Sequence, residues 1–230
     1  MDEVNTPARP AVSRRKPVVT YTLAAICAAV YLLEMLLGAD SNTFILALMG
    51  AKVNAWIAAG EYWRLLSPVF LHGGLDHLAF NLYVLVVWGR VLEAMYGQAK
   101  YLAIYLIAGV FGNLCSYVFS PYLAVGASGA IFGLFGALLY FRKKDKIAFN
   151  AMFGMQVLLI IGFNLFYGFI RTGIDNFAHI GGLLGGFLAA LALGLYGERV
   201  PKARRIAVIA GMVLLAGAAI VAGQMMYLQP

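Results

Sequence analysis

Charged residues are scarce in this sequence. Aspartate, glutamate, lysine and arginine make up 12% of the 230 residues, whereas 63% are hydrophobic and the mean hydropathy is +0.84. A soluble globular chain carries about 25% charged residues. The composition therefore excludes one or two soluble domains and predicts a polytopic membrane protein. The net charge of +7 does not indicate nucleic-acid binding, because the basic residues are distributed as membrane topology requires.

Cysteine is nearly absent as well. The two cysteines, Cys27 and Cys115, both lie in apolar runs, where a thiol packs as a small hydrophobic group. Two cysteines in such positions do not form a disulfide framework, and the sequence has no metal-ligand spacing. We therefore expect neither a metal ion nor another cofactor.

Seven apolar runs predict seven transmembrane helices and an all-α fold. They cover about 18–37, 77–95, 101–119, 128–141, 149–170, 177–196 and 206–227. The first run is interpreted as a retained span, because about 20 apolar residues exceed the roughly 7–15 of a signal-peptide core. We divide the chain into a polar tail (1–17), a six-helix core (18–196), and a basic loop with a seventh helix (197–230).

The long connection between the first two spans, residues 38–76, is too apolar for a solvated linker and too interrupted for a span. Its aromatic residues Trp56, Tyr62 and Trp63 favour a membrane–water interface, so a partly helical interfacial loop is expected. With the amino terminus inside, all lysines and arginines except Lys52, Arg64 and Arg171 are cytoplasmic. The positive-inside rule thus predicts a cytoplasmic amino terminus and an outer carboxyl terminus.

The fourth predicted span is too short for the membrane. Residues 128–141 give about 21 Å of helix at 1.5 Å per residue, against a hydrocarbon core about 30 Å thick. Because Arg142 and the lysines after it anchor the cytoplasmic end, the irregular segment 120–126 has to descend into the membrane from outside. Such backbone is tolerated where protein buries it or water reaches it. We therefore expect Ser128 at a helix amino terminus, below the outer surface, in a cavity that water enters.

Ser128 and His179 are the polar residues that stand out in these runs. A lone serine in an apolar helix is usually a packing residue that bonds its own backbone, whereas a histidine in lipid indicates function by default. Glycines share a helical face with each residue and permit close helix packing. These are Gly129, Gly133 and Gly136 after the serine, and Gly182 and Gly186 after the histidine. Ordinary small-residue packing explains the glycines equally well, but it does not explain the histidine.

A third polar cluster begins the second span. His77 and Asn81 are four residues apart and so share a helical face. Both side chains can donate hydrogen bonds to the oxyanion of a tetrahedral intermediate. The alternative is a polar clamp between helices. We interpret the nearby His72 as a loop or interface histidine.

Together, these motifs resemble the rhomboid family of intramembrane serine proteases. The resemblance rests on Gly126-Ala127-Ser128-Gly129, Ala178-His179-Ile180-Gly181-Gly182, His77-x-x-x-Asn81 and Glu61-Tyr62-Trp63-Arg64. It covers the six-helix core, and the seventh helix is similar to the six-plus-one form of some members.

The resemblance implies roles for these residues. Ser128 would be the nucleophile and His179 its general base, while His77, Asn81 and the Ser128 backbone N–H would form the oxyanion hole. Trp63 and Arg64 would be structural. Phe132 stands where many members have tyrosine, and we expect its ring to pack on the imidazole.

The resemblance also implies single-span membrane proteins as substrates, cleaved in the lipid bilayer near the outer face. We expect a multi-pass protein of the bacterial inner membrane, with no nucleic-acid or metal partner. Asp175 lies one turn before His179, and we expect it to face water rather than complete a triad.

Two other classes of function stay open. A catalytically inactive rhomboid relative that acts as a membrane chaperone would share the fold, although such relatives typically lack the serine or the histidine. A proton-coupled transporter could use His77 and His179 as a relay, although the sequence shows no inverted repeat.

Overall fold

The computed structural model describes Ser13 and residues 16–228, and over these residues the protein is all-helical, as predicted. The helices are α1 Val18–Leu37, α2 Thr43–Met49, α3 Asn54–Ala58, η1 Tyr62–Leu65, η2 Ser67–Phe70, α4 Leu75–Tyr96, α5 Gln98–Phe119, α6 Ser128–Lys144, α7 Lys146–Met152, α8 Gln156–Ile170, α9 Asn176–Leu193 and α10 Lys202–Tyr227. The one strand-type pairing within the described residues is an isolated antiparallel bridge between Lys52 and Ala124.

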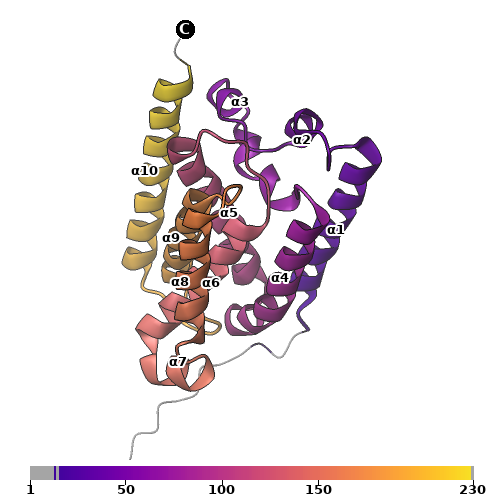
Figure 1. The fold of residues 1–230 in the computed structure, drawn as a ribbon. Coiled ribbons are helices and arrows are strands. Elements are labelled where there is room, and N and C mark those ends of the chain that lie inside the picture. The colour runs from indigo at the N-terminus through magenta and orange to yellow at the C-terminus, as the bar shows by residue number, and fades with distance from the viewer. Residues whose placement is uncertain (1–12, 14–15, 229–230) are drawn as a thin grey trace, which may run out of the picture.

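Five of these helices, α1, α4, α5, α9 and α10, are long and apolar enough to cross a membrane, and the pair α7 and α8 would make a sixth span. The helix α6 has 17 residues and is shorter than each of the five. The start of α1 and the end of α10 lie at opposite ends of the bundle (Figure 1). The count of seven spans stays a prediction, and so does the side of the membrane on which each chain terminus lies.

The prediction of one continuous helix over 149–170 is wrong. The chain forms α7 and α8 there, bent by 78° with respect to each other. Gly154 lies in the break with φ 55°, in the left-handed region that glycine adopts without steric cost and that stops an α-helix. The residues around Gly154 are apolar on both sides, so hydropathy alone did not reveal the break.

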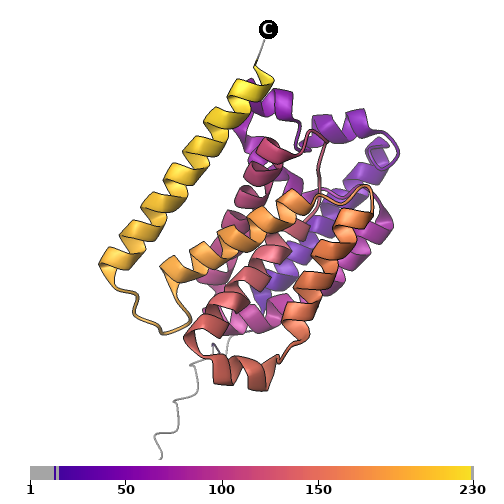
Figure 2. The same ribbon diagram turned by 60° about the vertical axis from the view of Figure 1, so that its left-hand side comes forward.

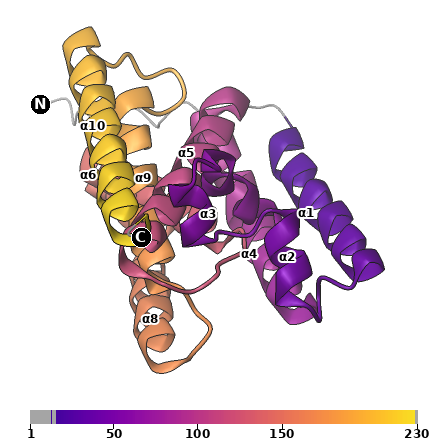
Figure 3. The same cartoon turned by 90° about the horizontal axis from the view of Figure 1, so that it is seen from above.

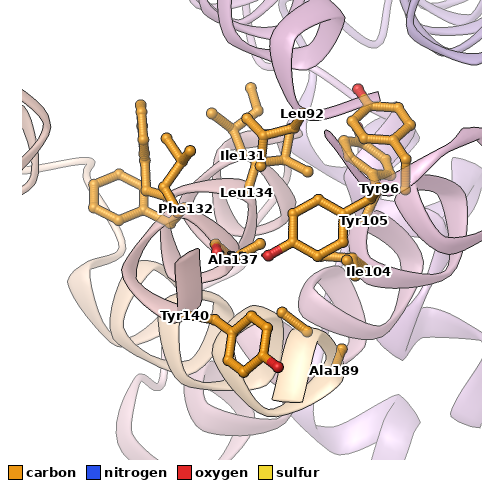
Figure 4. Close-up of a cluster of buried hydrophobic side chains, with 14 of the residues drawn as sticks. Leu92, Tyr96, Ile104, Tyr105, Ile131, Phe132, Leu134, Ala137, Tyr140 and Ala189 are labelled. Atoms are coloured by element: carbon orange, nitrogen blue, oxygen red, sulfur yellow. Dashed lines mark hydrogen bonds between the residues drawn. The ribbon is translucent and has the colours of Figure 1, made fainter. Parts of the chain in front are cut away.

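The helix α6 forms the centre of the fold. Twelve of its 17 residues are buried, and it packs mainly against α5 and α9. Large side chains of α6 pack against large side chains of α4 and α5, and Leu92, Tyr105 and Leu134 are examples (Figure 4). The hydroxyl of Tyr96 donates to the carbonyl of Ala137 on α6 at 2.7 Å. The helix that begins with Ser128 is therefore held on several sides.

The glycine faces of α6 and α9 lie in direct contact, as predicted. A Cβ atom at Gly182 would overlap the carbonyl oxygen of Gly129, and one at Gly186 would overlap that of Gly133. On the same face, a Cβ at Gly136 would overlap the carbonyl of Leu183. The two backbones can approach this closely only because these residues are glycines, which have no Cβ atom.

The outer helices and the long connection enclose this centre. At one edge α1 packs on α4, whose buried Glu93 accepts hydrogen bonds from the backbone of Val19 (3.1 Å) and Thr20 (2.8 Å) at the start of α1. At the opposite edge α10 lies along α5 and α9 (Figures 2 and 3). Residues 38–74 are partly helical, as predicted, and α2 and α3 lie at the same end of the bundle as the end of α10 (Figure 1).

Candidate active site

Ser128 is the first residue of α6, as predicted, and the segment before it is irregular. This segment is fixed by backbone hydrogen bonds: Lys52 N–H to Ala124 O (2.9 Å), Ala124 N–H to Lys52 O (3.2 Å) and Gly126 N–H to Pro68 O (2.8 Å). Gly126 has φ 125°, a conformation that side chains disfavour. The glycine is therefore required at the turn that leads to Ser128.

The structure brings Ser128 and His179 together across 51 positions of sequence. Ser128 Oγ lies 3.0 Å from His179 Nε2, within hydrogen-bonding distance. His179 lies in the first turn of α9 and is 8% exposed, whereas Ser128 is half-buried. The hydroxyl can donate to Nε2 when the ring proton is on Nδ1, which is the arrangement a general base requires.

Phe132 supports the imidazole from the α6 side. Its ring is stacked on that of His179 with centroids 4.2 Å apart and planes 6° from parallel. The predicted packing of Phe132 on the imidazole is confirmed. Because Phe132 and Ser128 are four residues apart on α6, one helical face carries both groups that contact His179.

Asp175 does not contact the imidazole. Its Oδ1 accepts the backbone N–H of Ala178 at 3.0 Å, as an N-cap of α9, and its Oδ2 accepts a short hydrogen bond from the Ser116 hydroxyl. In the part of the chain that the structure describes, His179 Nδ1 has no hydrogen-bond partner. Asp175 is half-buried, so it faces water only in part, and both carboxylate oxygens are bonded to protein groups.

His77 reaches the segment before Ser128, but Asn81 is turned partly to its own helix. A Cβ atom at Gly126 would lie 2.6 Å from Cε1 and 2.7 Å from Nε2 of His77, so the imidazole adjoins the Gly126 backbone. The amide of Asn81 donates to the carbonyl of His77 at 2.9 Å. Both residues lie in the first two turns of α4, as the spacing predicted.

His72 lies in a loop, as predicted, and its side chain is fully buried within the protein. Its backbone N–H donates to the Glu34 carboxylate (3.0 and 3.2 Å), and its ring meets that of His77 edge-on at 5.2 Å. Burial lowers the pKa of His72 to about 3, with a smaller contribution from His77, so the ring is neutral at pH 7.

The motif in the long connection packs around Arg64. The guanidinium of Arg64 lies 4.3 Å from the ring centroids of both Trp56 and Trp63. It also donates to the carbonyls of Ala47 (2.5 Å) and Ala51 (3.1 Å). The planar guanidinium has several N–H donors, so it can bind the two carbonyls and pack on the two tryptophan rings at the same time. A lysine ammonium group is less suited to this.

A Rhomboid domain model matches residues 59–196, more than half of the chain. The chain belongs to the rhomboid family. It is 47% identical over 193 residues to "Rhomboid protease GluP" of Bacillus subtilis (strain 168), a match that covers 82% of this chain and 38% of GluP. It is 30% identical over 235 residues to "Rhomboid-like protease 2" of Toxoplasma gondii, covering 96% of this chain and 81% of that protein.

A plant rhomboid gives a similar result. "RHOMBOID-like protein 5" of Arabidopsis thaliana is 38% identical over 184 residues, covering 74% of this chain and 56% of that protein. With its long apolar helices, this rhomboid is an integral, multi-pass membrane protein of a protease family. The motifs in the sequence indicate Ser128 and His179, but no motif indicates Lys52 or Ser116. The structure places these two residues beside the segments that precede Ser128 and His179.

Proposed function

We propose that this rhomboid is an intramembrane serine endopeptidase that works through a Ser128–His179 dyad. The observation that carries the proposal is the 3.0 Å approach of Ser128 Oγ to His179 Nε2, at the start of a buried helix. An inactive chaperone would not need this contact, and a proton relay through His77 and His179 would not need the serine.

The chemistry follows from this pair. His179 Nε2 takes the Ser128 proton while Oγ attacks a substrate carbonyl, and the proton then passes to the amine that leaves. The resulting ester is hydrolysed by water, which His179 deprotonates in turn. Serine and histidine are regenerated at the end of the cycle.

The oxyanion has donors close by. The first α-helical hydrogen bond of α6 runs from Ile131 N–H to Ala127 O (2.9 Å), so the amides of residues 128–130 have no acceptor within the helix. The positive end of the α6 dipole lies at the same point. The His77 imidazole adjoins Gly126 and can add a side-chain donor, and Asn81 lies one turn further along α4.

The proposed setting is the lipid bilayer. Seven spans, a cytoplasmic amino terminus and a core of residues 18–196 would place the start of α6 toward the outer face, in the bacterial inner membrane. The substrates would be single-span membrane proteins whose helix unwinds near that face, because a regular helix engages its carbonyls. The half-buried Ser128 side chain supports access by water and substrate at this end.

The test is cleavage of a single-span model substrate by the purified protein, with Ser128→Ala as the control. We expect cleavage by the wild type and none by the variant, whose stability should stay within about 1 kcal/mol because the change removes one hydroxyl. Equal cleavage by the two proteins, both folded, would remove Ser128 from the mechanism.

A further inference from the structure

A lysine that the catalytic chemistry does not use lies fully buried beside the site. Lys52 belongs to the connection between α2 and α3 and has 0% exposure. Its ammonium group donates to the carbonyls of Ser120 (3.0 Å) and Ser116 (3.4 Å), at the end of α5. Burying a cation is costly unless its donors are satisfied, and the carbonyl end of a helix is a favourable place for it.

Lys52 holds the segment that leads to Ser128 at two points. The side chain binds the carbonyl of Ser120, where this segment leaves α5, and the backbone pairs in both directions with Ala124, four residues before Ser128. The amide of Asn54 donates to the same Ser120 carbonyl at 2.9 Å. The position of the α6 amino terminus thus depends on the loop that contains Lys52.

The same lysine is connected to the helix of His179. The Ser116 carbonyl accepts a hydrogen bond from the Lys52 ammonium group, and the Ser116 hydroxyl donates to Asp175. Asp175 in turn caps the first turn of α9 by accepting the Ala178 N–H. Burial lowers the pKa of Lys52 to about 8, and the Asp175 charge opposes this shift. The side chain therefore remains mainly an ammonium ion at pH 7.

We propose that Lys52 is a positioning residue that sets the distance between Ser128 and His179. It does so by fixing the segment before α6 directly and the start of α9 through Ser116 and Asp175. This inference rests on the proposed function of the Ser128–His179 pair. In the part of the chain that the structure describes, Lys52 makes no hydrogen bond to Ser128 or His179, so it acts on them through other residues.

The experiment compares Lys52→Met with Lys100→Met. Lys100 is a matched control, because its ammonium group also donates to two carbonyls after a helix, Gly194 (3.1 Å) and Leu195 (2.7 Å), but at the far end of α9. Both variants and the wild type are assayed below their melting temperatures for kcat, KM and the rate of labelling by a serine-directed fluorophosphonate.

We expect Lys52→Met to lower kcat and the labelling rate by about tenfold to a hundredfold, the scale of a misplacement of about 1 Å. Its KM should change by less than about threefold, since substrate contacts remain, and Lys100→Met should keep both rates within about twofold. A purely structural role would lower the melting temperature of both variants and leave the rates of the folded fraction unchanged.

Wild-type rates in folded Lys52→Met would overturn the positioning role while leaving the proposed protease function intact. A wild type that does not cleave would instead contradict the proposed function, and this inference with it. If Lys52→Met does not fold, Asn54→Ala takes its place, because Asn54 is uncharged and binds the same Ser120 carbonyl. In Asn54→Ala, a lower kcat at constant KM supports the proposal, and an unchanged kcat contradicts it.

Discussion

The ring of Phe132 lies parallel to the imidazole of His179, with planes 6° apart and centroids separated by 4.2 Å. Asp175 is bonded to Ser116 and Ala178, so the imidazole is held by this packing together with its contact to Ser128 Oγ. In the proposed dyad, an aromatic face would take the place that a carboxylate has in a soluble triad.

Replacing Phe132 with leucine should therefore slow catalysis without preventing folding. Loss of an aromatic pair is worth about 0.5–1.5 kcal/mol, so we expect labelling of Ser128 by a fluorophosphonate to slow by up to about tenfold. Phe132→Tyr keeps the ring and serves as the control, with a rate near that of the wild type. Equal labelling of the leucine variant and the wild type would show that the stack is dispensable.

The contact between α6 and α9 should not tolerate bulk. A side chain at Gly182 would overlap the backbone of Gly129, so Gly182→Val should destabilise the fold by about 1–3 kcal/mol and reduce cleavage by separating Ser128 from His179. Gly211→Val on α10 is the control, because a Cβ there meets nothing within 4 Å. A Gly182→Val protein with normal melting temperature and rate would contradict the packing argument.

His77 and Asn81 should contribute to the oxyanion hole. Removing one donor costs about 10²–10³ in turnover, and we expect His77→Ala to fall in this range. Asn81→Ala should cost less, since the Asn81 amide already donates to the His77 carbonyl. The measurement is kcat with folding verified for each variant, and full activity in both would leave them with a structural role only.

Asp175 should not act as a third catalytic residue. We expect Asp175→Asn to keep kcat within about tenfold, a change of about 1.4 kcal/mol at most, because the amide oxygen can still accept the Ala178 N–H and cap α9. His179→Ala should reduce cleavage and fluorophosphonate labelling to background. If Asp175→Asn lost about 10³ in kcat while folded, the scale of a disrupted triad, the dyad mechanism would be wrong.

The far end of the bundle should respond to acid through Glu198. Its carboxylate binds Lys144 (3.0 Å) and Arg204 (3.1 Å) and accepts the Leu195 N–H (3.0 Å). Burial raises its pKa, but the backbone and side-chain hydrogen bonds outweigh burial and lower the pKa to about 2.

Because this pKa is lower in the folded than in the unfolded protein, Glu198 stabilises the fold above about pH 4.5 and loses this effect as the pH falls toward about 2. We expect Glu198→Gln to lower the free energy of unfolding by about 1 kcal/mol at neutral pH. The difference in melting temperature from the wild type should shrink on acidification. A difference that is constant with pH would mean that the charge of Glu198 is not what stabilises this end.

The sequence by itself determined the helices and the neighbours within each helix. Long apolar runs form helices in a membrane because their backbone groups must bond within the segment, so α4, α5, α9 and α10 could be placed from hydropathy. Helical spacing likewise put Phe132 on the face of Ser128, and His77 one turn before Asn81. The motifs at Ser128 and His179 also indicated the family before any geometry was known.

Only the tertiary structure decided which distant groups meet. Whether Ser128 reaches His179, whether Asp175 bonds to Ser116 rather than to the imidazole, and whether Lys52 is buried all depend on how α5, α6 and α9 pack. Hydropathy records how apolar a segment is, not which polar group will satisfy a buried donor or acceptor. A lysine in a connecting loop therefore reads as a solvated charge until the fold surrounds it with carbonyl groups.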